Sequence, residues 1–147
     1  MKRMRAVPAP TPLASSGKLG DWFANLLYGS PQLIICVSEK TLLPLILPAQ
    51  GAARFAEGLR AQLPEVLRAL GVASSAIAQE MSEMNETVIA ATNNRQVLGS
   101  MNDFAYMLGA HLEAGDSLLE ASLKLAEAPC SPLGMNSPER ATKALFR

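Results

Sequence analysis

The spacing of hydrophobic and polar positions divides the chain into a β-rich first part and a largely helical remainder. Three apolar stretches rich in β-branched and aromatic residues predict strands at 22–28, 32–38 and 41–47. The break Glu39-Lys40 has the length of a tight hairpin, so we expect an antiparallel meander, although the usual Gly or Asn is missing. A helix at 22–28 stays open, because short apolar runs do not discriminate helix from strand.

Two further features refine the predicted sheet. Pro44 cannot donate a hydrogen bond to a neighbouring strand, so the third strand is expected to lie at an edge or to be bulged there. Residues 86–92 (ETVIAAT) return to β-forming types without helical spacing, which predicts a fourth strand. The predicted fold class is therefore α+β: an antiparallel β-meander with one further strand, packed against several helices.

From residue 52 apolar residues recur at three- and four-residue steps, which predicts an amphipathic helix over 52–70. Pro64 must either kink this helix or start a second one, and Gly71 ends it. The serine pair at 74–75 is expected to cap a short helix that continues to Met84. Glu80 and Glu83 are expected on its solvated face, where paired-carboxylate chemistry is the alternative.

The last third of the chain predicts three more helices, so the C-terminal half is helical. Ser100 followed by Asp103 has the pattern of a helix start. Gly115-Asp116 is expected to end that helix and cap the next. Ser137-Pro138 then predicts a capped terminal helix. Residues 1–18 are Pro-rich and lack either period, so we expect a loosely held arm at 1–18 and a single α+β domain at 19–147.

Composition narrows the classes of function. Hydrophobic residues make up 49% and charged residues 18%, as in a globular protein, and no apolar run reaches the length of a membrane span, so no membrane partner is expected. Basic and acidic residues cancel at 13 each, which gives no strongly basic nucleic-acid surface. Cys36 and Cys130 lack metal-ligand or CxxC spacing, and free thiols in a reducing, cytoplasmic setting are the simpler interpretation.

No catalytic or cofactor signature stands out. His111 is the single histidine, and it falls on the apolar side of its helix, where a packing role is expected. Zinc needs three or four close ligands and a nucleotide needs a glycine-rich phosphate loop, and neither pattern occurs. We therefore expect no metal and no cofactor, and an enzyme is the less favoured class.

Two groups of polar residues are candidate binding sites. The first joins the end of the fourth strand to a helix start, where free amides and side chains converge, and Arg95 would grip a carboxylate or phosphate there. Capping alone is its structural alternative. The second group lies in an apolar strand, where a buried Asn needs a partner, for which we expect the backbone. The candidates are Asn94, Arg95, Ser100, Asn102 and Asp103 in the first group, and Trp22 and Asn25 in the second.

Four strings of residues together resemble an uncharacterised bacterial domain family, itself related to plasmid ORF-3-like proteins. They are LGDWFANLL at 19–27, EKTL at 39–42, LGSMNDF at 98–104 and APCSPL at 128–133. The similarity covers about 19–146, and the arm departs from it, because it is Pro-rich where relatives have a strand-like segment. The resemblance implies no activity; its plasmid association favours a regulatory or conflict-related role.

The sequence thus favours a non-catalytic interaction protein, such as an antitoxin or an inhibitor of a defence system, that binds a protein partner. Two alternatives stay open: a small-molecule- or nucleotide-binding enzyme using Asn94 to Asp103, and a nucleic-acid binder using the basic arm. Self-association also stays open. Several methionines either fill the core or line an adaptable partner groove, and core filling is favoured; they include Met81, Met84, Met101 and Met107.

Overall fold

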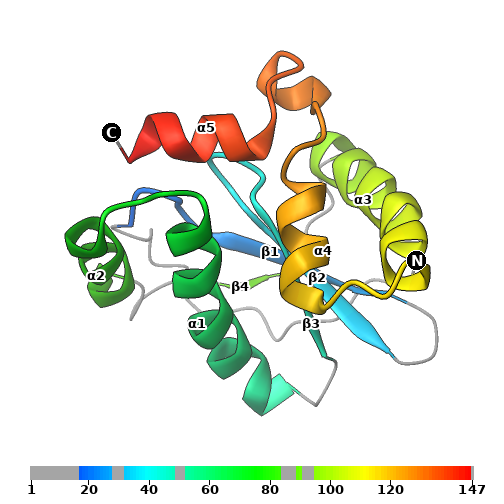
Figure 1. Ribbon diagram of the computed structural model, residues 1–147, viewed down its shortest axis with the longest axis horizontal. Coiled ribbons are helices and arrows are strands. Elements are labelled where there is room, and N and C mark those ends of the chain that lie inside the picture. The colour runs from blue at the N-terminus through cyan, green and yellow to red at the C-terminus, as the bar shows by residue number, and fades with distance from the viewer. Residues whose placement is uncertain (1–16, 28–31, 49–51, 84–88, 91–94, 147) are drawn as a thin grey trace.

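A computed structural model describes residues 17–27, 32–48, 52–83, 89–90 and 95–146 (Figure 1). Its sheet has the strand order β3-β2-β1-β4. Helices pack on both faces of the sheet, and Figure 1 shows α4 standing between α1 and α3. The α+β class, with helices dominating the C-terminal half, is confirmed.

Three strands form the predicted meander. β1 (Trp22–Leu27) pairs antiparallel with β2 (Leu33–Ser38), which pairs antiparallel with β3 (Pro44–Pro48). The further strand returns to the sheet as β4 (Ile89–Ala90), which pairs parallel with β1. The rest of the predicted strand 86–92 lies outside the described residues, as do residues 1–16, so the division at residue 18 stays a prediction.

The connection between β2 and β3 is longer than the tight hairpin predicted at Glu39-Lys40. It runs over 39–43, and Leu42 adopts a left-handed backbone with φ 54°. The Ser38 hydroxyl accepts from the Leu43 N–H and lies 3.0 Å from the Thr41 hydroxyl. These side-chain contacts replace the Gly or Asn of a two-residue turn and extend the loop.

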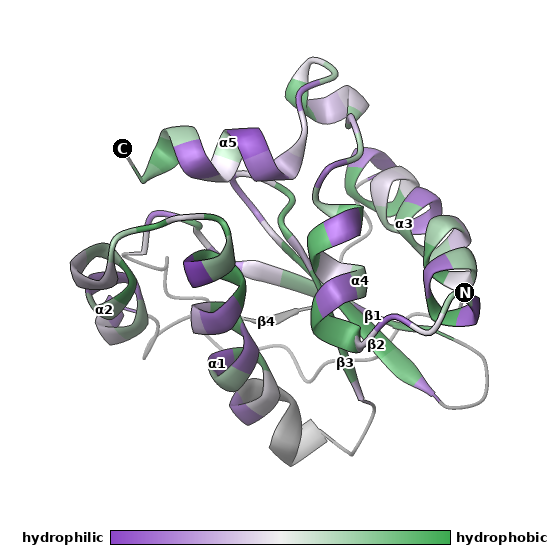
Figure 2. Cartoon of the chain, viewed as in Figure 1, coloured by the Kyte–Doolittle hydropathy of each residue, from purple (hydrophilic) through white to green (hydrophobic). Residues whose placement is uncertain are grey.

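β2 is buried along its whole length because helices cover both faces of the sheet. One cluster of buried apolar residues joins the sheet to α1 (Ala52–Ala69), and a second joins it to α3 (Arg95–Glu113). α4 (Leu118–Leu125) contributes to both clusters. Figure 2 shows hydrophobic colours along the central strands and hydrophilic bands on the helices.

β3 lies at the edge of the sheet, as Pro44 predicted, and α4 covers that edge. The Ile46 N–H donates to the Ser122 hydroxyl at 3.0 Å, and the Gln62 side-chain amide donates to the same oxygen at 3.1 Å. Ser122 in turn donates to the Leu118 carbonyl at 2.7 Å. One buried hydroxyl therefore accepts from an amide on the outer side of β3, where the described residues form no further strand to accept it.

Replacing Ser122 by alanine is expected to lower the free energy of unfolding by about 2 kcal/mol, because the buried Ile46 amide loses its acceptor. Urea denaturation measures this loss. Ser82→Ala is the matched control, since the exposed Ser82 hydroxyl also donates to a carbonyl of the preceding turn, that of Gln79. Equal stability of the two variants would contradict this role of Ser122.

The first two helices differ in detail from the sequence prediction. α1 contains Pro64 and continues past it, so no second helix starts there. Gly71, with φ +87°, ends this helix as predicted. α2 spans Ser74–Glu83, and the Ile77 N–H donates to the Ala73 carbonyl. The predicted serine cap is therefore wrong, because the pair at 74–75 already lies inside the helix.

The later helix boundaries correct two predictions and confirm one. α3 begins at Arg95, five residues before the predicted start at Ser100. α4 is capped by Ser117, which forms a reciprocal capping box with Glu120, so Asp116 is not the cap. α5 (Pro138–Leu145) begins behind the Ser137 cap, as predicted. No helix in the described part of the chain is long and apolar enough to cross a bilayer.

Glu80 lies in the core of the molecule, 2% exposed, and not on a solvated face as predicted. Its carboxylate accepts from the backbone N–H of Lys18 at 2.8 Å and of Leu19 at 3.2 Å. These two bonds join α2 to the segment that leads into β1. The role of Glu80 in the described residues is thus structural, because a carboxylate that receives two amides satisfies otherwise orphaned donors.

Candidate functional site

α3 turns one continuous face to solvent, and three of the predicted site residues lie on it. Arg95, Asn102 and Asp103 are exposed at helical spacing. Tyr106, one turn beyond, is 87% exposed, the most exposed large hydrophobic residue described. We call this surface the α3 face; its exposed positions are Arg95, Gln96, Gly99, Asn102, Asp103, Tyr106, Gly109, Ala110 and Glu113.

Two glycines flank Tyr106 on the α3 face. A Cβ atom added at Gly99 or at Gly109 would meet nothing within 4 Å, so packing inside the chain does not require glycine there. Glycine in a helix interior is less favourable than alanine by roughly 0.5–1 kcal/mol. Tyr106 is thus the one aromatic side chain on this face, and the two glycines leave the backbone uncovered at their own positions.

The other members of the first predicted group do not join this face. Ser100 is buried one turn before Asp103 and is not part of this exposed face, and Asn94 lies outside the described residues. Because α3 starts at Arg95, the amides of Ser100 and Asp103 lie within the helix and are not free to bind an anion. The predicted helix start at these residues, with its converging amides, is therefore wrong.

Ser100 faces the loop that contains Cys130, whose thiol is buried. Burial, and then the negative charge of Asp103, raises the pKa of the Cys130 thiol, while a hydrogen bond with Ser100 opposes that rise. Complete burial likewise raises the pKa of Cys36. Both free cysteines therefore stay protonated at neutral pH and are poor nucleophiles.

Trp22 and Asn25, the second predicted group, lie on opposite faces of β1. Trp22 belongs to the cluster that includes α1, whereas Asn25 reaches Met101 of α3 through an N–H···S contact of 3.2 Å. The expected bond from Asn25 to the backbone is therefore wrong. The Trp22 Nε1 and Asn25 Oδ1 atoms are buried without a hydrogen-bond partner among the described residues. The sheet separates the two side chains, so they do not form one site.

The contacts of the other residues considered for a chemical role are those of structural residues. His111 is half-buried with Nδ1 3.7 Å from an oxygen of Asp116, which also binds Lys124 at 2.8 Å. Among the described residues no group of three or more His, Cys, Asp and Glu side chains is placed to hold a metal ion. Met101 is fully buried and Met81 packs against the core, as core filling predicts.

A family model described as a domain of unknown function (DUF6933) matches residues 1–141 of the chain. A search of the curated proteins and a search of the solved structures found no match to the chain. Among the members of the α3 face that the sequence interpretation missed, Tyr106 is the aromatic one. Its signal was an aromatic residue three positions after Asp103, on the polar side of an amphipathic helix.

Proposed function

The chain belongs to this family of unknown function, and from its geometry we propose that the protein acts without catalysis, by binding another protein through the α3 face. The observation that carries this proposal is Tyr106, 87% exposed on a helix whose other side is fixed in the core. Tyrosine is enriched among residues that dominate binding energy at protein interfaces. An exposed aromatic residue on a rigid helix is a suitable anchor.

The surroundings of Tyr106 support this use. Phe104 and Leu108 on the inner side of α3 are buried, so the helix is already ordered before a partner arrives and little entropy is lost on binding. Gly109, one turn after Tyr106, leaves room for close approach beside the ring. Asn102 and Asp103 offer polar groups next to it, and Arg95 adds a positive charge nearer the start of the helix.

The charges of the α3 face have both signs, which favours a protein partner of matching pattern over a nucleic acid. Arg95 is positive, whereas Asp103 and Glu113 are negative. Such a pattern fixes the orientation of a partner more than it raises affinity. The resemblance to a bacterial family related to plasmid ORF-3-like proteins favours an antitoxin or an inhibitor of a defence system. The two cysteines, which form no disulfide, fit a bacterial cytoplasm.

Replacing Tyr106 by alanine is expected to weaken binding of the partner by about 30-fold or more, the loss typical of a central aromatic anchor. The tagged chain would capture its partner from the host, and titration of the purified partner would measure affinity for each variant. The melting temperature should not change, because the removed ring lies in solvent.

Met135→Ala is the matched control, because Met135 is the other large exposed hydrophobic residue described, at 62%. It lies in the loop before α5 and is not part of the α3 face, so its loss should leave affinity unchanged. Equal binding by the Tyr106→Ala variant and the unmodified chain would refute the proposal. A captured second copy of the chain would identify self-association as the interaction, and sedimentation would then measure it.

A further inference from the structure

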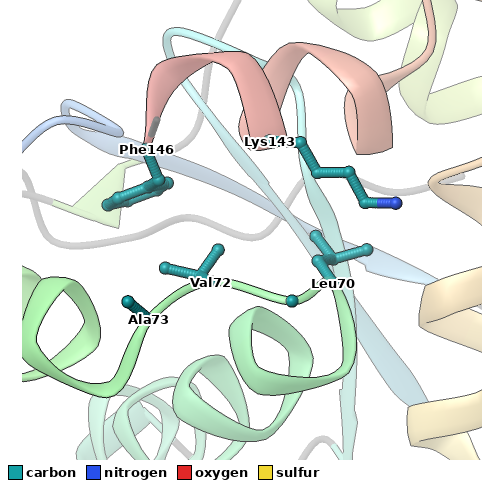
Figure 3. Close-up of a pocket in the computed structure, with 6 residues that line it drawn as sticks. Leu70, Val72, Ala73, Lys143 and Phe146 are labelled. Atoms are coloured by element: carbon teal, nitrogen blue, oxygen red, sulfur yellow. The ribbon is translucent and has the colours of Figure 1, made fainter.

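A cavity of about 390 Å³ lies between the α1–α2 connection and the end of α5 (Figure 3). Leu70 and Val72 line one side of it, and Lys143 and Phe146 line the other, from the last turn of α5 and the residue after it. In Figure 3 the Phe146 ring lies on the side of Val72, whereas the Lys143 side chain passes above Leu70 with its ammonium pointing away from Phe146. Its volume is in the range of small-molecule sites. This cavity is separate from the α3 face.

The charged groups at this cavity are positive. Among the described residues that line it, Lys143 is the one with a charge; outside the lining, the Lys18 ammonium lies 5.6 Å from the centre of the Phe146 ring. Lys143 has a partner, Glu139 at 3.4 Å, but its side chain is 45% exposed, and exposed pairs of this kind are weak enough to exchange for another anion. The site therefore offers apolar side chains beside one ammonium group, that of Lys143.

The start of α2 also favours a negatively charged ligand in this cavity. Ala73 lines the cavity and immediately precedes Ser74, the first residue of α2, whose first turn contains no acidic residue. The positive end of the helix dipole at this point therefore has no carboxylate from its own first turn. The cavity itself, with Lys143 and the Phe146 ring, defines the site, and the helix start adds to its positive potential.

We propose that this cavity binds a small organic carboxylate that carries an apolar group. The carboxylate contacts the Lys143 ammonium, and the apolar group lies against Val72 and Phe146. A single compact ammonium on the lining suits a singly charged head group better than a phosphate, which is typically gripped by an arginine fork or several backbone amides. The same chemistry is offered by a free acid and by the C-terminal residue of a peptide.

The test is a titration of the full chain with octanoate, followed by backbone amide NMR shifts, with octylamine as the probe of opposite charge. Octanoate is expected to saturate and to shift the amides of 70–73 and Phe146, whereas octylamine should not. Lys143→Gln should weaken octanoate binding by about fivefold or more. Lys124→Gln, which removes the same charge from α4, should leave it unchanged.

A second variant tests the proposal even if Lys143→Gln does not weaken octanoate binding. Val72→Glu puts a negative charge on the lining and should abolish octanoate binding while the melting temperature confirms folding. Shifts outside this cavity, equal binding of octylamine, or undiminished binding by Val72→Glu would each overturn the proposal. Short peptides ending in leucine, with either a free C-terminal carboxylate or a C-terminal amide, then distinguish the two sources of the carboxylate. Binding of the carboxylate form and not of the amide form indicates that the cavity can take a peptide C-terminus. Binding of octanoate and of neither peptide indicates a free acid.

Discussion

Replacing Phe104 by alanine is expected to lower the free energy of unfolding by about 4 kcal/mol. Phe104 is 1% exposed and lies on the inner side of α3, in the cluster that contains Met101 and Leu108. Removing the ring leaves a cavity that the close-packed surroundings fill only in part, and the loss of transfer free energy adds to the cost. Urea denaturation followed by circular dichroism measures the change.

Tyr106→Ala provides the control for this experiment within the same helix. It removes a ring of similar size two residues away, but that ring is 87% exposed, so stability should change by less than about 0.5 kcal/mol. The pair of variants separates the two sides of α3: one loses stability, the other loses partner binding. A Phe104→Ala variant as stable as Tyr106→Ala would contradict the packing described for α3.

Replacing Glu80 by alanine is expected to lower the free energy of unfolding by about 3 kcal/mol. The backbone amides of Lys18 and Leu19 would both lose a charged acceptor, and each unsatisfied donor costs about 1–3 kcal/mol. Glu80→Gln keeps one carbonyl oxygen and should fall between the alanine variant and the unmodified chain. Chemical denaturation of the three proteins gives the order.

Glu83→Ala is the matched control for Glu80, because both glutamates belong to α2. The Glu83 carboxylate accepts from the exposed side chain of Gln79, so its loss should change stability by less than about 0.5 kcal/mol. Hydrogen exchange adds a local readout, since the amides of Lys18 and Leu19 should lose protection in Glu80→Ala. Unchanged protection there would show that the carboxylate does not hold this segment.

The fold class could be predicted because it depends on local patterns. The strands follow from β-branched runs such as that of β2, and Pro44 identified the edge without any tertiary information. The burial of Glu80 could not be predicted, because its partners lie more than sixty residues earlier in the chain. A glutamate with no charged partner nearby in sequence has the same local pattern whether it is solvated or buried.

The sequence predicted the start of α3 at Ser100, five residues after its observed start, although the pattern of apolar residues indicated the earlier start. Ser100 and Asp103 have the residue types of a helix start, but Val97 continues the buried spacing of Met101 and Phe104 one turn earlier. Inside α3, Ser100 faces a neighbouring loop and Asp103 faces water, so neither side chain has to cap a helix. The sequence thus identified polar residues of the α3 face, Arg95, Asn102 and Asp103, without the arrangement that relates them.

The position of α4 also restricts how the protein can recognise a partner. Many proteins bind an extended peptide by adding it as a new strand to an open sheet edge, and the same edge chemistry lets copies polymerise. At β3 that route is closed, because the Ser122 hydroxyl already holds the Ile46 amide and α4 lies over the strand. Recognition along this edge must therefore use groups other than the β3 backbone, and a mutation that loosens α4 would leave the edge strand open to pairing with another chain.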